Sequence, residues 1–283
     1  MTTKHLYILV LFLLFGMVAD PPFTYAHKLD DDDSPISFNL EMLSWEKVDE
    51  IIPNKTKFTV IDVETGKQFN VQRRAGSKHA DVQPLTNEDT QIMKEVYNGK
   101  WSWKRRAALV LIDDQLIAGS MHGMPHGAGA LQNGFPGHFC IHFSGSTTHR
   151  SKNPDFSHEL MILKAAGKLD EYINGAGPDE VIEVFAESIN QGDSALFRFT
   201  TSGNGQTRLE KAIKKIEHIA LGDTTVNPLK NGEGILVVEM PVKAEMYRKN
   251  AGKERTTIRF ILRKDGMTDR WTIDSQSLYG QLK

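Results

Sequence analysis

The chain has 283 residues, of which 40% are hydrophobic and 25% are charged, and its formal net charge is −2. This composition is typical of a soluble globular protein with one large domain or two ordinary ones. The charge balance is close to neutral, so we expect neither nucleic acid nor an anionic membrane surface as a partner.

The first residues predict an export signal. Lys4 precedes an apolar run over 6–19, and Thr24-Tyr25-Ala26 supplies small residues for cleavage after Ala26. An uncleaved anchor is the alternative, but the run is short for a membrane span. Residues 27–38 include four consecutive aspartates and predict an acidic linker. We therefore expect a secreted, cell-envelope-associated protein with no integral membrane domain once residues 1–26 are removed.

The segment 39–174 predicts a β-rich domain. Alternating apolar and polar residues predict hairpins over 57–73 and 107–121 and a strand over 138–143. Helices are expected over 45–52, 86–97 and 155–169, with a capping box that begins at Thr86. The polar segment 75–84 contains His79 and Asp81 and is expected to be a loop.

A glycine-rich stretch closed by Pro178 predicts a domain boundary between residues 174 and 178. The following residues predict two helices and then a strand meander, over 179–190, 207–216, 234–247, 256–263 and 270–275. This order resembles the nuclear-transport-factor-2/cystatin-like fold, which implies a curved antiparallel sheet wrapped on a helix over 178–283. The expected fold class is α+β, and the second domain is expected to have a structural or binding role.

Residues 121–149 contain the chain's only cysteine, Cys140, and half of its ten histidines. Strand periodicity puts His138, Cys140 and His142 on one face and aromatic residues on the other. A lone cysteine cannot form a disulfide within its chain, and it is often just a small buried hydrophobe. Its imidazole neighbours favour a reactive thiol instead. An imidazole lowers the pKa of the thiol or accepts its proton, and either His122 or His138 could serve.

The order of these residues resembles the catalytic motif of the L,D-transpeptidases of bacterial cell walls. His122-Gly123 is followed after fourteen residues by Gly137-His138-Phe139-Cys140-Ile141-His142. The resemblance implies that Cys140 is the nucleophile, His122 the general base, Gly123 a backbone orienter of that base and His138 a supporting residue, with peptidoglycan peptide stems as substrate. The sequence departs from the motif at Gly137, usually serine or threonine, at Phe139, usually glycine, and at His142, often arginine.

Two other functions are consistent with the sequence. A zinc-dependent cell-wall peptidase is the first alternative, with ligands from His79, Asp81, His138 and His142, and with Cys140 as a further possible ligand. The second is a non-catalytic protein that binds a cell-wall polymer. Elsewhere in the chain, His149 and His158 are expected at the surface or at a helix cap. His126 fits either a site or a surface position.

Overall fold

The computed structural model describes residues 39–148, 153–223 and 234–283. The predicted signal peptide, the acidic linker and His149 lie outside these residues. Contacts group Phe38–Lys283 into one compact unit, so the domain boundary between residues 174 and 178 stays a prediction. No helix in the described ranges is long and apolar enough to cross a membrane.

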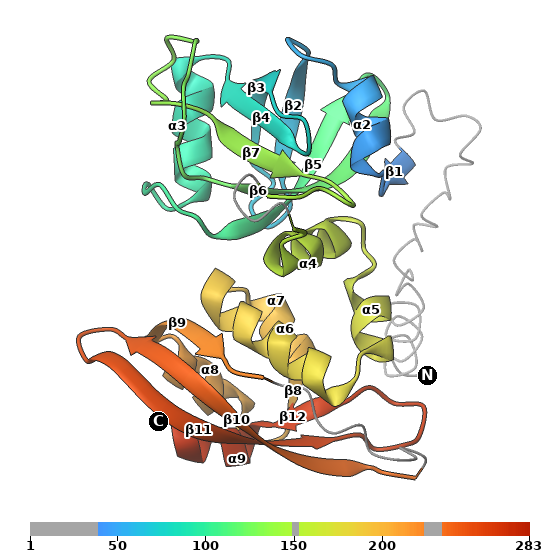
Figure 1. Cartoon of the computed structure of the whole chain (residues 1–283), viewed down its shortest axis with the longest axis vertical. Coiled ribbons are helices and arrows are strands. Elements are labelled where there is room, and N and C mark those ends of the chain that lie inside the picture. The colour runs from blue at the N-terminus through green and yellow to red at the C-terminus, as the bar shows by residue number, and fades with distance from the viewer. Residues whose placement is uncertain (1–38, 149–152, 224–233) are drawn as a thin grey trace, which may run out of the picture. The chain divides into compact units, whose positions relative to one another are not determined.

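Six antiparallel strands form a closed barrel, visible in the upper part of Figure 1. The strands are β2 (Lys57–Asp62), β3 (Gln68–Ala75), β4 (Ala80–Pro84), β5 (Arg105–Ile112), β6 (Gln115–His122) and β7 (Phe139–His142). They follow the order β5-β2-β3-β4-β7-β6, and β6 pairs back with β5. A short additional strand, β1 (Asn39–Glu41), runs parallel to the first half of β6. Closure leaves the barrel strands without free edges over most of their length.

Alternate residues of the barrel strands pack into one apolar core. On and just after β7, Phe139, Ile141 and Phe143 are fully buried in this core. Cys140 and His142 therefore point away from it, which confirms the two-faced strand that the alternation predicts. Helices α2 (Trp45–Ile51) and α3 (Asn87–Val96) contribute to the same core, and Thr86 and Asp89 form the predicted capping box.

The prediction of a loop over 75–84 is confirmed for residues 76–79 and was wrong for residues 80–84. Residues 80–84 form β4, and all five are buried. The segment is rich in polar residues and contains a single β-branched residue, Val82, so its own propensity for strand is weak. Strand pairing on both sides holds it in place, since β4 pairs with β3 through a bulge at Arg73/Ala75 and with β7 along its other edge.

The remainder of the described chain contains five helices, a second sheet and a C-terminal helix. The helices are α4 (Phe156–Ala165), α5 (Leu169–Gly175), α6 (Pro178–Gln191), α7 (Ser194–Thr200), α8 (Gln206–Ile213) and α9 (Ser275–Leu282). The sheet contains β8 (Thr201–Ser202), β9 (Ile216–Leu221), β10 (Val237–Arg248), β11 (Gly252–Arg263) and β12 (Thr272–Asp274), in the order β8-β12-β11-β10-β9.

Helix α6 packs its apolar face onto this second sheet, with Val181 and Phe185 in a core that includes Met246 and Phe260. The α+β class is therefore confirmed. The sheet is mixed rather than antiparallel throughout, because β12 and β8 run parallel. The sequence patterns missed three helices and two strands, namely α5, α7, α9, β8 and β9. The likeness to the nuclear-transport-factor-2/cystatin-like fold stays a prediction.

Helix α4 covers the outer face of β5 and β6 and so shapes the region next to Cys140. Its residues Leu160 and Met161 are fully buried with Ala107 and Ala118 of the barrel. Alanines on the strands allow the helix to approach closely. The helix N-terminus is capped by Asp155, whose side chain accepts a hydrogen bond from the backbone N–H of His158.

Lys164, near the end of α4, links the barrel to α7. Its Nζ lies 2.5 Å from Oδ2 of Asp193, the N-cap of α7, and 2.7 Å from Oε1 of Glu64. Burial by itself would raise the pKa of Asp193, but the Lys164 charge and hydrogen bonds from Lys164 and two backbone amides lower it below the usual value. Burial would likewise lower the pKa of Lys164, yet Asp193 and Glu64 raise it.

We expect Asp193→Asn to destabilise the protein at neutral pH by about 3 kcal/mol, because it leaves the Lys164 charge largely buried. Asparagine keeps the helix cap, so the change isolates the charge. The lowered pKa of Asp193 means that its stabilising effect is present above the unfolded value of about 3.9 and is lost as the pH falls through the folded value. The free energies of unfolding of the wild-type and Asp193→Asn proteins, measured in urea, should therefore converge in acid. Glu64→Gln, at a more exposed partner, should cost less than about 1 kcal/mol. Equal losses of stability in the two variants would contradict the conclusion that Asp193 is the main partner of Lys164.

Candidate functional site

Strand register builds the site on the outer face of β4, β7 and β6. Asp81 on β4 lies directly opposite Cys140 on β7, and His142 on β7 lies opposite Ser120 on β6. Directly paired residues project their side chains from the same face of a sheet. Two residues further along the same register, His79 is beside His142 and His122 is beside Cys140.

The loop between β6 and β7 covers one end of this face. An isolated bridge joins His126 to His138, with two backbone hydrogen bonds of 2.9 Å. Gly137 makes this bridge possible, because it has a φ of +131° and a Cβ there would lie 2.5 Å from the His126 carbonyl oxygen. A Cβ at Gly127 would in turn lie 2.3 Å from the ring of His138. These two glycines thus hold the two half-buried imidazoles over Cys140.

The opposite end is closed by α4, which places His158 against β6 and β7. Its Nδ1 lies 2.8 Å from the Ser120 hydroxyl, and its ring stacks on His142 with centroids 3.7 Å apart. His142 also stacks on His79 at 4.6 Å, so three imidazoles form a continuous stack. Burial, reinforced by His142, holds the pKa of His158 well below its usual range. His158 was predicted at the surface or at a helix cap. The surface position was wrong, because the residue is 3% exposed, and the helix-cap position is confirmed, because its backbone N–H donates to the N-cap residue Asp155.

Cys140 lies at the centre of the cluster and is 2% exposed. Its Sγ lies 3.3 Å from Nε2 of His126 and 3.5 Å from Oδ1 of Asp81, to which the thiol donates. Burial raises the pKa of the Cys140 thiol, and the charge and hydrogen bond of Asp81 raise it further. Of the two roles expected for a neighbouring imidazole, accepting the thiol proton is the role that the contact with His126 supports.

The His126 ring is oriented as a proton acceptor for that thiol. Its Nδ1 lies 3.1 Å from the carbonyl oxygen of Met124. A carbonyl only accepts, so Nδ1 carries the proton and the neutral ring presents a lone pair at Nε2 toward Cys140. A nucleophile, a base and a group that orients the base are the three parts of an activated thiol.

His122, the base that the motif implies, is placed differently. Its Nδ1 accepts the backbone N–H of Met124 at 3.3 Å, so the proton of the neutral ring is on Nε2. Burial, together with the neighbouring His126 and Arg105, holds its pKa well below the usual range. Its ring contacts Trp103 at 4.7 Å and His126 at 5.2 Å between centroids. His122 therefore stays neutral and supports the position of His126.

Asp81 lies between two further imidazoles. Its Oδ1 is 3.2 Å from Nε2 of His79 and 3.8 Å from Nε2 of His138. The Nδ1 atom of each ring contacts a backbone carbonyl oxygen. The distance is 2.8 Å from His79 to Thr147 and 3.0 Å from His138 to Ala128. Both rings thus direct Nε2 at the carboxylate next to Cys140.

Two departures from the transpeptidase motif have structural explanations. Phe139 fills the barrel core and does not adopt the left-handed backbone that would require glycine. The glycine requirement lies at Gly137 instead. Gly123 is also constrained, since a Cβ there would lie 2.4 Å from the Tyr97 ring, and its N–H donates to the Ser102 carbonyl.

A cavity of about 140 Å³ lies against His142 and His158, at the α4 end of the cluster, with Ser144, Ser146 and Asp155 among its lining residues. The stack of imidazoles thus extends from Asp81 to this cavity. No sequence signal marked Ser120 or His158 as neighbours of the site, because their proximity depends on how α4 packs. The sequence did contain a signal for His126, because His126-Gly127 repeats the histidine-glycine pair His122-Gly123 of the motif.

Within the described residues, three sets of side chains could hold a metal ion, and all three include Cys140. In each set the ligand atoms lie within 4.8 Å of one another. The sets are His79, Cys140 and His142; His122, His126 and Cys140; and Asp81, His138 and Cys140. The four zinc ligands expected from the sequence thus all lie beside Cys140, although they do not form one set.

Comparison of the chain with protein-family models, curated proteins and solved structures gives no match. The chemistry of the cluster is therefore argued from its own geometry.

Proposed function

We propose that this protein is an exported cell-envelope enzyme that transfers acyl groups through the thiol of Cys140. The observation that carries the proposal is the chain of contacts from Cys140 Sγ to His126 Nε2 and from His126 Nδ1 to the Met124 carbonyl, at 3.3 and 3.1 Å. The substrate class, peptidoglycan peptide stems, follows from the resemblance of residues 122–142 to the L,D-transpeptidase motif. The general base is His126 in place of His122.

The first step forms an acyl-enzyme. The Cys140 thiol transfers its proton to Nε2 of His126 as the sulfur attacks the carbonyl carbon of a stem peptide bond. The tetrahedral intermediate then collapses and the carbon–nitrogen bond breaks. The leaving amine takes the proton from the His126 imidazolium, so that a thioester on Cys140 and a neutral imidazole remain.

The second step uses the same two residues in reverse. An amine of a second stem gives its proton to His126 and attacks the thioester carbonyl. The carbon–sulfur bond breaks, and the imidazolium returns the proton to Cys140. Water in place of the amine would give hydrolysis. Substrate enters from the side of the β6–β7 loop, where His126 and His138 are only half-buried.

The Met124 carbonyl and the glycines of the loop act by positioning. The carbonyl fixes the tautomer of His126, and Gly137 allows the backbone bridge that holds the ring over the thiol. A base that is already oriented does not have to be ordered in the transition state, which lowers the entropic part of the barrier.

We expect Cys140→Ala to abolish acyl transfer, because no other thiol exists in the chain. The measurement is mass spectrometry of the full chain after incubation with a synthetic stem peptide. The wild-type protein should gain the mass of the acyl group on the peptide that contains Cys140. Acyl transfer at the wild-type rate by a folded Cys140→Ala protein would exclude the thiol mechanism.

We expect His126→Ala to lower kcat by about 100-fold or more, which is the usual contribution of a general base. His122→Ala is the matched comparison, since His122 ends β6 only four residues before His126 and the two rings are in contact. It should lower kcat much less. Far-UV circular dichroism checks that both variants fold. The opposite ranking, with His122→Ala the more damaging change, would return the base to the residue that the motif implies.

A further inference from the structure

We propose that the Cys140 thiolate and one ring nitrogen each of His79 and His142 bind a divalent transition-metal ion of the zinc class, and that the bound ion caps the nucleophile. The capping role rests on the proposed acyl-transfer function. The binding site itself does not, because it follows from the arrangement of the three side chains.

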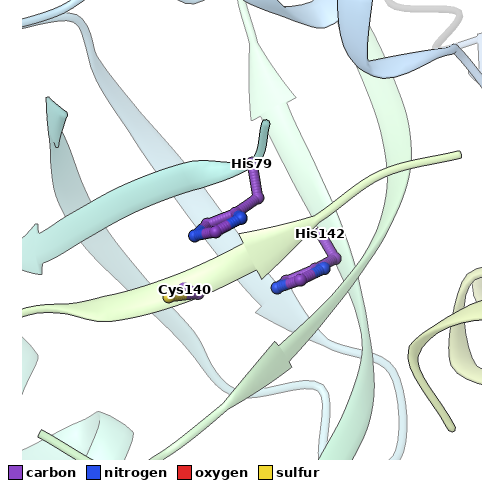
Figure 2. A group of neighbouring side chains, drawn as sticks. All are labelled: His79, Cys140 and His142. Atoms are coloured by element: carbon purple, nitrogen blue, oxygen red, sulfur yellow. The ribbon is translucent and has the colours of Figure 1, made fainter. Parts of the chain in front are cut away.

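The three donors are already close together, with His79 directly before β4 and the other two on β7. Their ligand atoms lie within 4.8 Å of one another, and the side chains are 2%, 2% and 3% exposed for His79, Cys140 and His142. Figure 2 shows the two imidazoles side by side, with a ring nitrogen of each turned toward the cysteine. Tetrahedral zinc, with bonds of about 2.0 Å to nitrogen and 2.3 Å to sulfur, separates two nitrogen donors by roughly 3.3 Å and a nitrogen from a sulfur donor by roughly 3.5 Å. Small side-chain rotations reach these values.

The hydrogen bonds of His79 fit the role of a metal ligand. A metal-binding histidine almost always donates its other N–H to a carbonyl or carboxylate, which fixes the tautomer. The Nδ1 of His79 lies 2.8 Å from the Thr147 carbonyl oxygen, which leaves the lone pair of the neutral ring on Nε2.

The centre also needs positive charge. In the neutral tautomer, Nε2 of His79 presents a lone pair to Oδ1 of Asp81 at only 3.2 Å, which places one acceptor against another. A metal ion bound at Nε2 relieves this repulsion. Thiolate and imidazole are the ligands that zinc-class ions prefer, and Cys140 adjoins both groups. A divalent ion would compensate the charges of the Cys140 thiolate and of Asp81 together.

Binding changes no oxidation state. The thiol proton leaves to solvent, and a sulfur lone pair forms the bond to the metal ion. That lone pair is then held by the metal and is no longer available to attack a carbonyl carbon. His126 is outside this set of three ligands, so its substitution separates acyl transfer from metal binding.

The test is a titration of Co²⁺ into the full chain after treatment with a chelator. Wild-type protein should bind one ion per chain and show a near-ultraviolet sulfur-to-cobalt charge-transfer band. Cys140→Ser should lose the band, and His79→Ala should weaken Co²⁺ binding more than about tenfold. His126→Ala should retain the band. His218→Ala is the matched control, because His218 is on β9 beside Tyr247 and lies outside the cluster.

Three results would overturn the site: no stoichiometric binding, a band that persists in Cys140→Ser, or equal affinities of the His79 and His218 variants. If a variant fails to fold, the proposal can still be tested on the wild-type chain alone. An ion that binds only the folded protein raises its thermal midpoint. We therefore expect Zn²⁺ to raise the midpoint, and an unchanged midpoint at saturating Zn²⁺ contradicts the proposal.

Acyl transfer by the chelated protein separates the two proposals. Cys140-dependent transfer that stops when one equivalent of Zn²⁺ is added supports capping, whereas transfer that rises with Zn²⁺ overturns it. If the metal-free protein forms no acyl-enzyme but binds Co²⁺ as described, the proposed function fails and the metal site stands. If the metal-free protein transfers acyl groups but does not bind Co²⁺, the metal site fails and the proposed function stands.

Discussion

The pairing of β7 with β4 on one edge and β6 on the other is the constraint on which the rest of the site depends. It closes the barrel and buries Phe139 and Ile141 inside it. Because side chains alternate along a strand, the same pairing forces Cys140 and His142 outward. The register then sets Asp81 beside the thiol. A shift of one residue would move the aromatic face out and the thiol into the core, so folding energy and site geometry depend on the same register.

The site contains several imidazole nitrogens whose lone pairs can accept a proton or bind a metal ion. His79, His126 and His138 each place Nδ1 on a backbone carbonyl and direct Nε2 toward Cys140 or Asp81. The lone pair of His126 accepts the thiol proton in the acyl-transfer proposal, and the lone pair of His79 binds a metal ion in the capping proposal. The two proposals therefore use different imidazoles of one cluster.

Local patterns predicted much of the fold around the site. The capping box at Thr86, the two hairpins and the alternating strand at 138–143 were all confirmed, since each depends on periodicity or on contacts between near neighbours in sequence. Strand β4 was missed because it is held by partners on both sides rather than by its own propensity. Helix α7 is short, and its stability depends on Asp193, which caps it and pairs with Lys164 from α4.

The sequence by itself determined which chemical groups gather here, since one thiol and five histidines fall within residues 121–149 and strand alternation puts three of these groups on one face. Only the tertiary structure decided which imidazole meets the thiol. The motif spacing points to His122, but the loop folds back through Gly127 and Gly137 and brings His126 to 3.3 Å from Cys140. The structure likewise added Ser120 and His158, because strand register and helix packing set distances between residues far apart in the chain, and local sequence patterns carry no record of them.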